Sequence, residues 1–261
     1  MTIISYLMKF PILKRLIPSL YKKYVFIFDQ YFKKAVINNV IYDLDLRHLI
    51  DRRFYFHNGY EDELFKPLNN IVRNEKVNFF LDVGSCWGVY SLRLAGNFKD
   101  LKILAFDPIK NNIDRLKHSI KKNSFKNIEC FHTAIGSKKS KVTLGATEKY
   151  SPNYEIDEKN SVINEISNLD YLDNLLDLND KSLILKIDTE GYELEVLKGA
   201  INLLKNNRCF CQIEVKENNK DKVFSFLKDI DYKIISINRF NKTDFFFLIL
   251  SKIKLKFNFI S

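Results

Sequence analysis

Between residues 77 and 230, apolar runs typical of buried strands alternate with segments of helical periodicity, and this alternation constrains the fold more than any other feature. The predicted strands are VNFFLDVG, LKILAFD, NIECFHTAIG, SLILKIDTEG and RCFCQIEV. The predicted helices include VYSLRLAGNF, NNIDRLKHSIKKN, LDYLDNLL, YELEVLKGAINLLKN and NKDKVFSFLKDI. Strands joined through helices connect by right-handed crossovers, so the pattern predicts a parallel sheet in an α/β fold.

The segments that flank this core predict further elements. The stretches AVINNVIYDLDL and RRFYFHNGY alternate apolar and polar residues, which predicts strands, and EDELFKPLNNIVRN predicts a helix. Near the C-terminus, YKIISIN and DFFFLIL are predicted strands, and the short polar RFNKT between them indicates an antiparallel hairpin. Residues 137–168 are polar and rich in loop-forming residues, and we expect this insertion to cover the substrate.

The basic charge of the chain lies at its two ends. Residues 1–56 hold ten Lys and Arg against four Asp and Glu, residues 57–215 hold 22 against 23, and residues 216–261 hold ten against five. These balances of +6, −1 and +5 make up the net charge of +10. We therefore expect ends that either meet an anionic surface or expose solvated lysines, around a central block whose chemistry needs no positive charge.

The cysteines narrow the class of protein. Cys86, Cys130, Cys209 and Cys211 form no CxxC pair and no Cys/His cluster with zinc-ligand spacing, so we expect neither a disulfide framework nor a structural metal site. Free cysteines indicate a reducing, cytoplasmic compartment. A non-catalytic nucleic-acid-binding protein is disfavoured, because the central block is neutral and carries neither a recognition helix nor an aromatic RNA-binding motif.

Residues 1–35 are predicted to form a basic, amphipathic extension. Lys9, Pro11 and Lys14 interrupt its apolar start, so it is neither a secretory signal nor the run of about 18 apolar residues that a spanning helix requires. Pro18 suits the first turn of a helix. The apolar residues that recur after it at helical spacing are Leu20, Tyr21, Tyr24, Val25, Phe28 and Phe32. This face either packs on the domain or lies on an anionic membrane, which would place the protein peripherally at the inner membrane face.

Asp82 and two glycines follow the first strand of the core. At the carboxyl edge of a parallel sheet, where open α/β folds bind ligands, Gly84 and Gly88 let the backbone approach a ligand closely. The loop has neither the GxGxxG pattern of a dinucleotide site nor the Lys-Ser/Thr pair of a triphosphate site, which disfavours the alternative of an NAD(P)-dependent oxidoreductase. The Asp82 carboxylate would repel a pyrophosphate but suits a ligand with a cation and an amino acid ammonium group. S-adenosylmethionine has these features.

The ends of the next two predicted strands offer further cofactor contacts. Asp107 ends ILAFD, where its carboxylate is expected to accept hydrogen bonds from both hydroxyls of a ribose. Phe106 and Pro108 would flank the adenine or the sugar, and Thr133 and Ala134 would border the adenine edge. The alternative for an acid at the end of a strand is a helix cap.

A resemblance to a known family is carried by FLDVGSCWGVYSL, ILAFDP, LILKIDTEGYELEVLKGA and CQIEV. Over about residues 40–250, the sequence resembles the FkbM family of S-adenosylmethionine-dependent methyltransferases. The resemblance implies a class I methyltransferase, a Rossmann-like α/β sheet of seven strands with a terminal antiparallel hairpin, preceded here by an N-terminal helical and stranded extension. It separates this extension, residues 1–35, from a methyltransferase domain, residues 36–261, with a cofactor-binding core over about residues 77–250. The implied reaction is O-methylation, commonly of a sugar or related hydroxyl on a glycan, glycolipid or natural product.

Transferred residue by residue, the resemblance implies cofactor-binding roles for Glu61, Asp82, Gly84, Ser85, Gly88 and Asp107. Glu61 of NGYEDELF matches an acid usually found upstream of the loop. The sequence departs from the family at Cys86 and Trp87, where small residues or Asn are usual. The bulk of Trp87 therefore bears on the detail of the cofactor pocket.

Three carboxylates are candidates for the catalytic step, because methyl transfer to an alcohol needs a base that removes the hydroxyl proton as attack proceeds. Asp188 and Glu190 follow the fourth predicted strand, and Glu214 lies near the end of the fifth. Neighbouring strands would bring them to one rim, as a base or as ligands of a divalent metal. Alternatively, Asp188 and Glu190 cap the helix YELEVLKGA. His57 in FYFHNGY is either a further candidate base or a packed residue.

Overall fold

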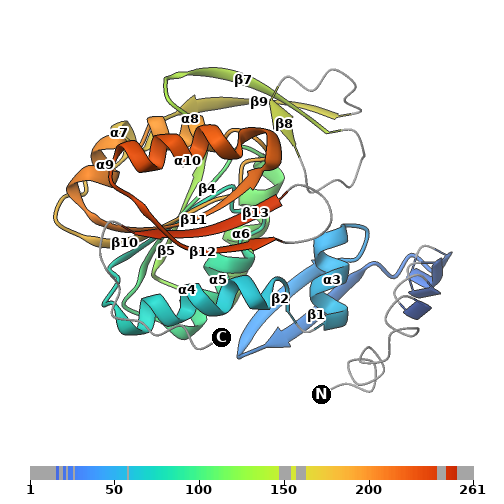
Figure 1. Ribbon diagram of the computed structural model, residues 1–261. Coiled ribbons are helices and arrows are strands. Elements are labelled where there is room, and N and C mark those ends of the chain that lie inside the picture. Colours follow the sequence, from blue (N-terminus) through green and yellow to red (C-terminus); the bar gives the residue numbers. More distant parts are fainter. Residues whose placement is uncertain are drawn as a thin grey trace.

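The computed structural model describes residues 16–17, 20–21, 23–25, 27–57, 59–146, 154–156, 163–239 and 245–251. Its centre is a sheet in which five parallel strands lie in the order β5-β4-β3-β10-β11 (Figure 1). These strands are β3 (Phe79–Val83), β4 (Lys102–Asp107), β5 (Ile128–His132), β10 (Ser182–Ile187) and β11 (Arg208–Lys216). Each corresponds to one predicted strand, so the prediction of a parallel α/β fold is confirmed.

Two further strands follow β11 in the sheet. β13 (Phe245–Ser251) pairs antiparallel with β11, and β12 (Lys233–Arg239) pairs antiparallel with β13. Residues 240–244, between these two strands, lie outside the described residues.

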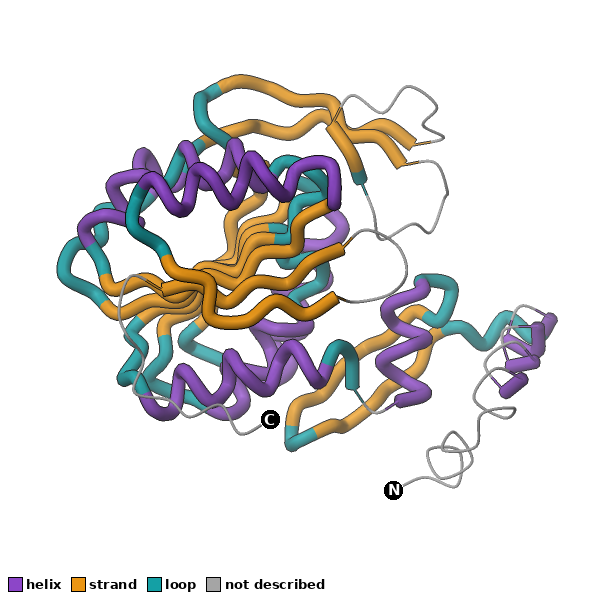
Figure 2. The backbone as a smooth tube through the Cα atoms, viewed as in Figure 1, coloured by secondary structure: helices purple, strands orange, loops and turns teal. Residues whose placement is uncertain are grey.

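Apolar side chains of the parallel strands pack on both faces of the sheet, because successive side chains alternate along a strand. Phe80 and Ile184 belong to one core cluster, whereas Leu81 and Leu183 belong to a second. Burial on both faces explains why these strands appear in the sequence as continuous apolar runs. Helices lie on either side of the sheet (Figure 2). The first cluster packs against α4 (Asp62–Asn74), α5 (Val89–Asn97) and α6 (Lys110–Asn123). The second cluster packs against α8 (Glu193–Lys198), α9 (Ile201–Asn206) and α10 (Lys220–Asp229). A short 3-10 helix, η1 (Glu217–Asn219), directly precedes α10.

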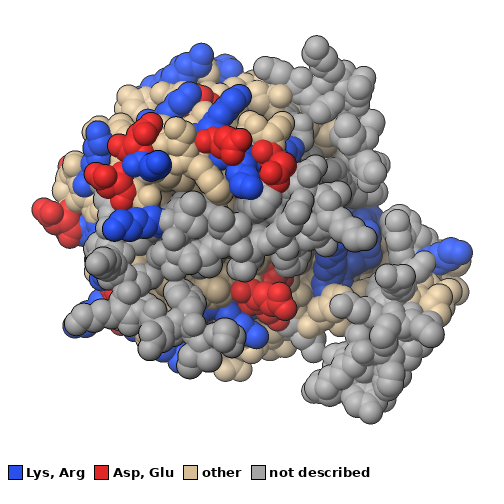
Figure 3. Space-filling view, in the orientation of Figure 1, with Lys and Arg blue, Asp and Glu red and all other residues tan. Residues whose placement is uncertain are grey.

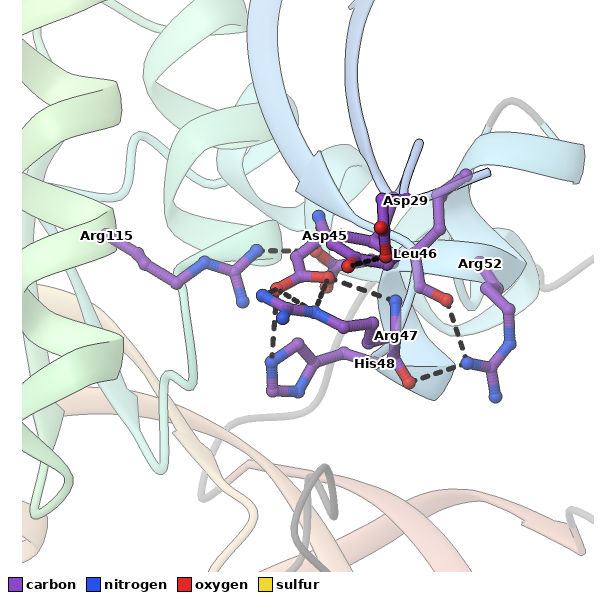
Figure 4. A network of polar contacts seen from close by, with 9 residues as sticks. Asp29, Asp45, Leu46, Arg47, His48, Arg52 and Arg115 are labelled. Atoms are coloured by element: carbon purple, nitrogen blue, oxygen red, sulfur yellow. Dashed lines mark hydrogen bonds and ion pairs between the residues drawn. The ribbon is translucent and has the colours of Figure 1, made fainter. Parts of the chain in front are cut away.

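The strand predicted for RRFYFHNGY is wrong, because these residues lie largely in helix α3 (Leu49–His57). Asp51 in the first turn of α3 is fully buried. Its carboxylate accepts a hydrogen bond from the N–H of Asp45 at 2.6 Å and forms an ion pair with Arg115 at 2.5 Å. Figure 4 shows Asp45 and Arg115 in this network of polar contacts. Helical spacing places Phe54 on the same buried face as Asp51. These long-range contacts outweigh the strand preference of an aromatic run.

The N-terminal segment shares a core with the sheet. β1 (Phe32–Ile37) and β2 (Val40–Asp45) form an antiparallel hairpin next to α3. Val25, Tyr42 and Phe54 lie in the same apolar cluster as the first face of the parallel strands. One side of the N-terminal helical residues therefore packs on the domain, as one of the two interpretations of this segment expects.

The insertion between β5 and β10 forms a second sheet, which lies at the top of Figure 1. Its strands lie in the order β6-β9-β7-β8. They are β6 (Ala134–Ile135), β7 (Ser140–Ala146), β8 (Glu155–Ile156) and β9 (Ile163–Asp170). The short helix α7 (Leu172–Leu175) leads back towards β10. Residues 147–153 and 157–162 of the predicted insertion lie outside the described residues.

The single helix predicted for YELEVLKGAINLLKN is divided into α8 and α9. The break falls next to Gly199, where a Cβ atom would lie 1.9 Å from the carbonyl oxygen of Gly136. A side chain at position 199 would collide with that backbone, so glycine permits the close contact between the helices and the start of the insertion.

Candidate active site

A cavity of about 270 Å³ lies at the carboxyl edge of the parallel strands. Residues at or after the ends of β3, β4, β5 and β10 line it, together with residues of α3, β7 and β8. Ligands of open α/β folds bind at this edge, near the point where the strand order reverses, which is here between β3 and β10. The charged residues that line the cavity are Arg53, Glu61, Asp107, Asp188, Glu190 and Glu214.

Most of the predicted site residues meet in this cavity. Those that line it are Glu61, Gly84, Asp107, Thr133, Ala134, Asp188, Glu190 and Glu214. Four others, Asp82, Ser85, Gly88 and His57, are not among the lining residues. His57 is the last residue of α3. The cavity thus brings together residues from six separate parts of the chain.

Gly84 brings the loop after β3 against the backbone after β10. Its φ is +76°, and a Cβ atom there would lie 1.8 Å from the carbonyl oxygen of Asp188. Its N–H donates to the carbonyl of Phe106 at 3.0 Å. Gly88 has a φ of +84° and lies against α6 instead. A Cβ atom at Gly88 would lie 2.3 Å from Cδ1 of Leu116. Both glycines therefore permit close contacts within the protein, whereas the sequence predicts a close approach of their backbone to a ligand.

Asp107 ends β4, and its carboxylate already has several partners. Oδ1 accepts hydrogen bonds from the N–H of Ile109 at 2.9 Å and the Asn112 amide at 3.0 Å, and Oδ2 accepts one from the N–H of Cys86 at 2.8 Å. Burial raises the pKa of Asp107 to about 7 in spite of these bonds. A carboxylate has about four acceptor sites, so one is left for a ligand. Contact with both ribose hydroxyls, as predicted, requires the Asn112 amide to give up its bond.

Asp82 is buried and serves the protein core, where the sequence predicts a contact with a cationic ligand. Its Oδ2 accepts a hydrogen bond from the Ser91 hydroxyl at 2.6 Å, and its Oδ1 lies 3.8 Å from Nζ of Lys186. Asp82 and Lys186 are direct partners in the register of β3 and β10. The charge of Asp82 therefore meets a lysine of the neighbouring strand.

Lys186 is a site residue that was not predicted. Its side chain is 4% exposed, and Nζ lies 3.2 Å from Oδ2 of Asp188 and 4.9 Å from the centre of the Tyr90 ring. Burial acts to lower the pKa of Lys186, but the surrounding carboxylates, Asp188 foremost, outweigh it and raise the pKa above its ordinary value. The signal in the sequence is one basic residue within the apolar run LILKID, because a lysine is rarely buried without a counter-charge.

Four acidic residues line the cavity on this side, and the charges of three of them, Glu61, Asp188 and Glu214, act on Lys186. The fourth is Glu190. Oε2 of Glu61 accepts a hydrogen bond from the Tyr90 hydroxyl at 3.0 Å. Oε2 of Glu190 lies 3.5 Å from Nζ of Lys216. Burial and the charge of Asp188 raise the pKa of Glu61.

Glu214 is a carboxyl group whose pKa lies above its ordinary value. Burial raises its pKa to about 10, and the charges of Asp188 and Glu61 act in the same direction. A raised pKa favours the protonated form of a carboxyl, which donates a hydrogen bond and does not take up a proton. Within the group, Glu214 is therefore suited to bind an acceptor oxygen rather than to act as its base.

The capping interpretation expects Asp188 or Glu190 at the start of helix α8, but neither of them is its N-cap residue. The helix begins at Glu193, and its N-cap residue Tyr192 makes no side-chain capping hydrogen bond. Oε1 of Glu193 accepts a hydrogen bond from the N–H of Gly191 at 2.6 Å. The turn before α8 is thus held by Glu193, and both predicted carboxylates belong to the cavity.

The bulky loop residue Trp87 packs into the core. Its side chain is buried and lies edge to face against Phe54 of α3 and Tyr42 of β2, with ring centres 5.6 and 6.1 Å apart. The Arg115 guanidinium lies 5.3 Å from the centre of its ring. The departure from the family at position 87 therefore fills space towards the N-terminal segment and leaves the cavity open. Cys86, in contrast, lines the cavity.

The second sheet and α3 contribute apolar residues to the site. From the second sheet, Leu144 lies on β7, Tyr154 directly precedes β8, and Ile156 lies on β8. Leu49 and Ile50 are the first two residues of α3. The cavity therefore has one part built from strand ends of the parallel sheet and another built from the insertion and the N-terminal segment.

The parallel sheet and the cavity at its carboxyl edge define a class I methyltransferase-like α/β fold. The profile of the methyltransferase FkbM domain matches residues 82–241, which is more than half of the chain, and the chain belongs to this family. The protein is a methyltransferase that uses S-adenosylmethionine. This assignment replaces the alternatives of an NAD(P)-dependent oxidoreductase and a non-catalytic nucleic-acid-binding protein.

Several solved methyltransferase structures are similar in fold. M. jannaschii TYW2 in complex with AdoMet is 11% identical, with a TM-score of 0.48 over 85% of this chain and 84% of that chain. A putative methyltransferase from Streptococcus mutans in complex with SAH is 12% identical, with a TM-score of 0.48 over 73% and 98%. A putative tRNA methyltransferase from Streptococcus pneumoniae in complex with S-adenosyl-L-methionine is 12% identical, with a TM-score of 0.48 over 75% of each chain. No protein of curated function matches the sequence.

The residues of the cavity fit S-adenosylmethionine. Asp107 has an acceptor site left for a ribose hydroxyl, and Phe106, Pro108 and Ala134 offer apolar surface for an adenine. The carboxylates near Lys186 complement the sulfonium and ammonium charges. In the ranges that the structure describes, no three His, Cys, Asp or Glu side chains form a group suited to hold a metal ion.

Proposed function

We propose that the protein transfers a methyl group from S-adenosylmethionine to a hydroxyl oxygen, with Asp188 as the general base. The group of carboxylates at the cavity carries this proposal, because a neutral alcohol attacks effectively only when its proton is removed. The bound cofactor supplies a methyl group on a positively charged sulfur. The side chains of the protein hold the acceptor, orient its hydroxyl and receive its proton.

Asp188 combines the properties that a base needs. Its side chain is 28% exposed, so that an acceptor in the cavity can reach it, and it pairs with Lys186 at 3.2 Å. This ion pair fixes the orientation of the Asp188 carboxylate. The protonated Glu214 then donates a hydrogen bond to the acceptor, and Glu190 helps to orient it.

For the cofactor, we propose that the loop from Asp82 to Gly88 forms its binding edge, with Asp107 on the ribose. Thr133 and Ala134 border the adenine, and Glu61 faces the ammonium group. Asp82, Ser85 and Gly88 act by shaping the loop, since they do not line the cavity. We also propose that β12 and β13 are joined as the terminal hairpin of a seven-stranded sheet, which their antiparallel pairing supports.

We propose further that the acceptor hydroxyl belongs to a sugar, in a glycan, a glycolipid or a related natural product. Tyr60, Tyr154 and Tyr192 line the cavity alongside its carboxylates. Carboxylates accept hydrogen bonds from several hydroxyls, and tyrosine rings offer an apolar face with a polar tip. A nucleic acid is not the proposed acceptor, because the described basic side chains around α10 are interspersed with acidic ones (Figure 3).

A screen with methyl-labelled S-adenosylmethionine tests the proposed reaction. The purified protein is incubated with candidate glycans, glycolipids and polyols, and the products are examined by mass spectrometry and fragmentation. We expect label to be gained as a methyl ether on a sugar oxygen. Label found only on nitrogen or carbon would overturn the proposed reaction, and label on the oxygen of an acceptor without a sugar would overturn the acceptor class alone.

The pKa of Asp107 predicts how cofactor affinity depends on pH. A ribose hydroxyl donates to the ionised carboxylate, so the carboxyl must lose its proton before it binds, and its pKa is about 7 in the free protein. We therefore expect the affinity for S-adenosylhomocysteine to fall by up to about tenfold per pH unit below pH 7. An unshifted aspartate would lose affinity only near pH 4. Calorimetry between about pH 5.5 and 8 measures this profile. Asp107→Asn should bind more weakly with a flat profile, and a flat profile in the unaltered protein would contradict the prediction.

We propose that the N-terminal apolar surface contacts an anionic membrane, which would hold a cytoplasmic protein at the inner membrane face. This surface consists of Leu20, Tyr24, Ile27, Phe28, Phe32 and Val36, whose side chains are 43% to 72% exposed. The opposite side of the helical residues packs on the domain, where the Tyr21 ring lies 5.2 Å from that of Phe56. Basic residues outnumber acidic ones by six in residues 1–56, which suits anionic headgroups. No helix in the described ranges is both long and apolar enough to span a bilayer.

Replacing three of these apolar side chains tests the membrane contact. The variant Leu20→Ser/Ile27→Ser/Phe28→Ser should lose most of its sedimentation with phosphatidylglycerol vesicles, since each buried side chain contributes about 1.5–3 kcal/mol to binding. Its affinity for S-adenosylhomocysteine should not change. Ile166→Ser on β9 is the matched control, because Ile166 is 69% exposed and lies elsewhere. Deleting residues 1–35 would be a poorer test, because it also removes the buried Val25 and most of β1. Equal sedimentation of the triple variant and the unaltered protein would refute the contact.

A further inference from the structure

Arg53 carries the one positive charge among the described residues that line the cavity. It projects from α3 and is exposed, and five acidic residues line the same cavity. Burial raises the pKa of Tyr60, and the charge of Arg53 acts against this shift, so the guanidinium lies close enough to influence the Tyr60 hydroxyl. Tyr60 is followed by Glu61, so Arg53 acts on the part of the cavity near Glu61.

The other arginines around α3 all have partners in the protein. Arg47 and Arg115 form ion pairs with aspartates, and Arg52 donates to two backbone carbonyls (Figure 4). Arg53 makes no hydrogen bond or ion pair with any residue that the structure describes. A guanidinium that is placed at a ligand cavity and is not used by the fold is available to a ligand.

We propose that Arg53 binds a carboxylate group of a ligand in this cavity. A guanidinium and a carboxylate match in a planar, bidentate geometry that supplies two charge-assisted hydrogen bonds. The carboxylate has two possible sources, the methionyl part of the cofactor or an acidic sugar as acceptor. The second source rests on the proposed function, whereas the first does not.

The charges around Arg53 favour a carboxylate over a phosphate. The carboxylates that line the cavity repel an anion, and they repel a phosphate with nearly two charges more strongly than a single negative charge. The methionyl carboxylate belongs to a molecule that also carries cationic groups, so the same carboxylates attract the rest of that ligand. One arginine and several acids therefore match a ligand in which one negative charge accompanies positive charge.

Two ligands that differ at the amino acid group test the first source. S-adenosylhomocysteine has the carboxylate, whereas 5′-methylthioadenosine has the same thioether and nucleoside without it. By calorimetry, Arg53→Gln should weaken binding of S-adenosylhomocysteine by about tenfold to a hundredfold and leave 5′-methylthioadenosine unchanged. Arg53→Lys should retain part of the affinity. Arg73→Gln removes an equal charge from an exposed position on α4 that does not line the cavity, and should change neither.

A second pair of ligands tests the acceptor as the source. With S-adenosylhomocysteine at saturation, the unaltered protein should bind glucuronate more tightly than glucose, and Arg53→Gln should remove this difference. A change in either pair supports the proposal and identifies the source of the carboxylate. The proposal would be overturned if Arg53→Gln changed the binding of neither pair of ligands. The melting temperature of the variant checks that it is folded. These binding ratios do not depend on methyl transfer, so failure of the proposed O-methylation would leave them intact.

Discussion

Asp188→Asn should lower the rate of methyl transfer by a factor of about 10² to 10⁴, the range that general base catalysis typically contributes. The amide has nearly the same shape as the carboxylate. It keeps an oxygen that can accept the hydrogen bond that Nζ of Lys186 donates to Oδ2 of Asp188 at 3.2 Å in the unaltered protein. It cannot take up the proton of the acceptor hydroxyl. The rate is measured at saturating cofactor, with the acceptor found by the labelling screen, so that a change in cofactor affinity does not enter.

Two neighbouring carboxyl groups serve as comparisons for Asp188. Glu214→Gln should keep most of the activity near neutral pH, because the amide resembles the protonated carboxyl that burial favours at this position. Glu190→Gln should have an intermediate effect if Glu190 only orients the acceptor. Melting temperatures are taken on the same preparations. If Asp188→Asn keeps its activity and loses stability, Asp188 only supports the fold, and Glu190 becomes the candidate base.

Gly84→Ala should destabilise the protein by about 4 kcal/mol or more, which is a large part of the 5–15 kcal/mol that typically separates folded and unfolded states. The added methyl group would lie 1.8 Å from the carbonyl oxygen of Asp188. Relief of this overlap requires the backbones after β3 and β10 to separate, and both lie at the cavity. The positive φ of +76° adds a further cost for a residue with a Cβ atom.

Gly191→Ala separates the two causes of this loss. Gly191 also has a positive φ, +110°, but the nearest atom to a Cβ there is 3.8 Å away. This variant should therefore lose only the conformational part, about 1–2 kcal/mol. Denaturant unfolding of both variants beside the unaltered protein gives the comparison. Equal losses in the two variants would show that the contact with Asp188 has no effect of its own.

The parallel sheet was predictable because its strands are buried on both faces, which leaves continuous apolar runs such as FFLDV in the sequence. Helix α3 was not predictable from its own residues. Its aromatic residues favour a strand, and the contacts that favour the helix involve Arg115, which lies on α6. A preference that depends on a partner distant in the sequence leaves no local signal.

The same distinction applies to the site. The meeting of Asp107, Asp188 and Glu214 at one cavity was predictable, because residues at the ends of parallel strands meet at one edge of the sheet. Asp82 lies within β3, and whether its side chain meets a ligand or the core depends on Lys186 of β10, about a hundred residues later. Arg53 was missed because it lies on the helix that was predicted as a strand.

The place where the second sheet joins the fold affects how such an enzyme can diversify. Its strands leave the core after β5 and return before β10, so they form one continuous stretch of chain between these two strands of the main sheet. Changes in length or sequence within that stretch reshape the wall formed by Leu144, Tyr154 and Ile156 without shifting Asp107 or Asp188. If the proposed function holds, we expect exchange of the part of this segment after β6 between related enzymes to change acceptor selectivity and to leave the proposed adenine contact of Ala134 in place.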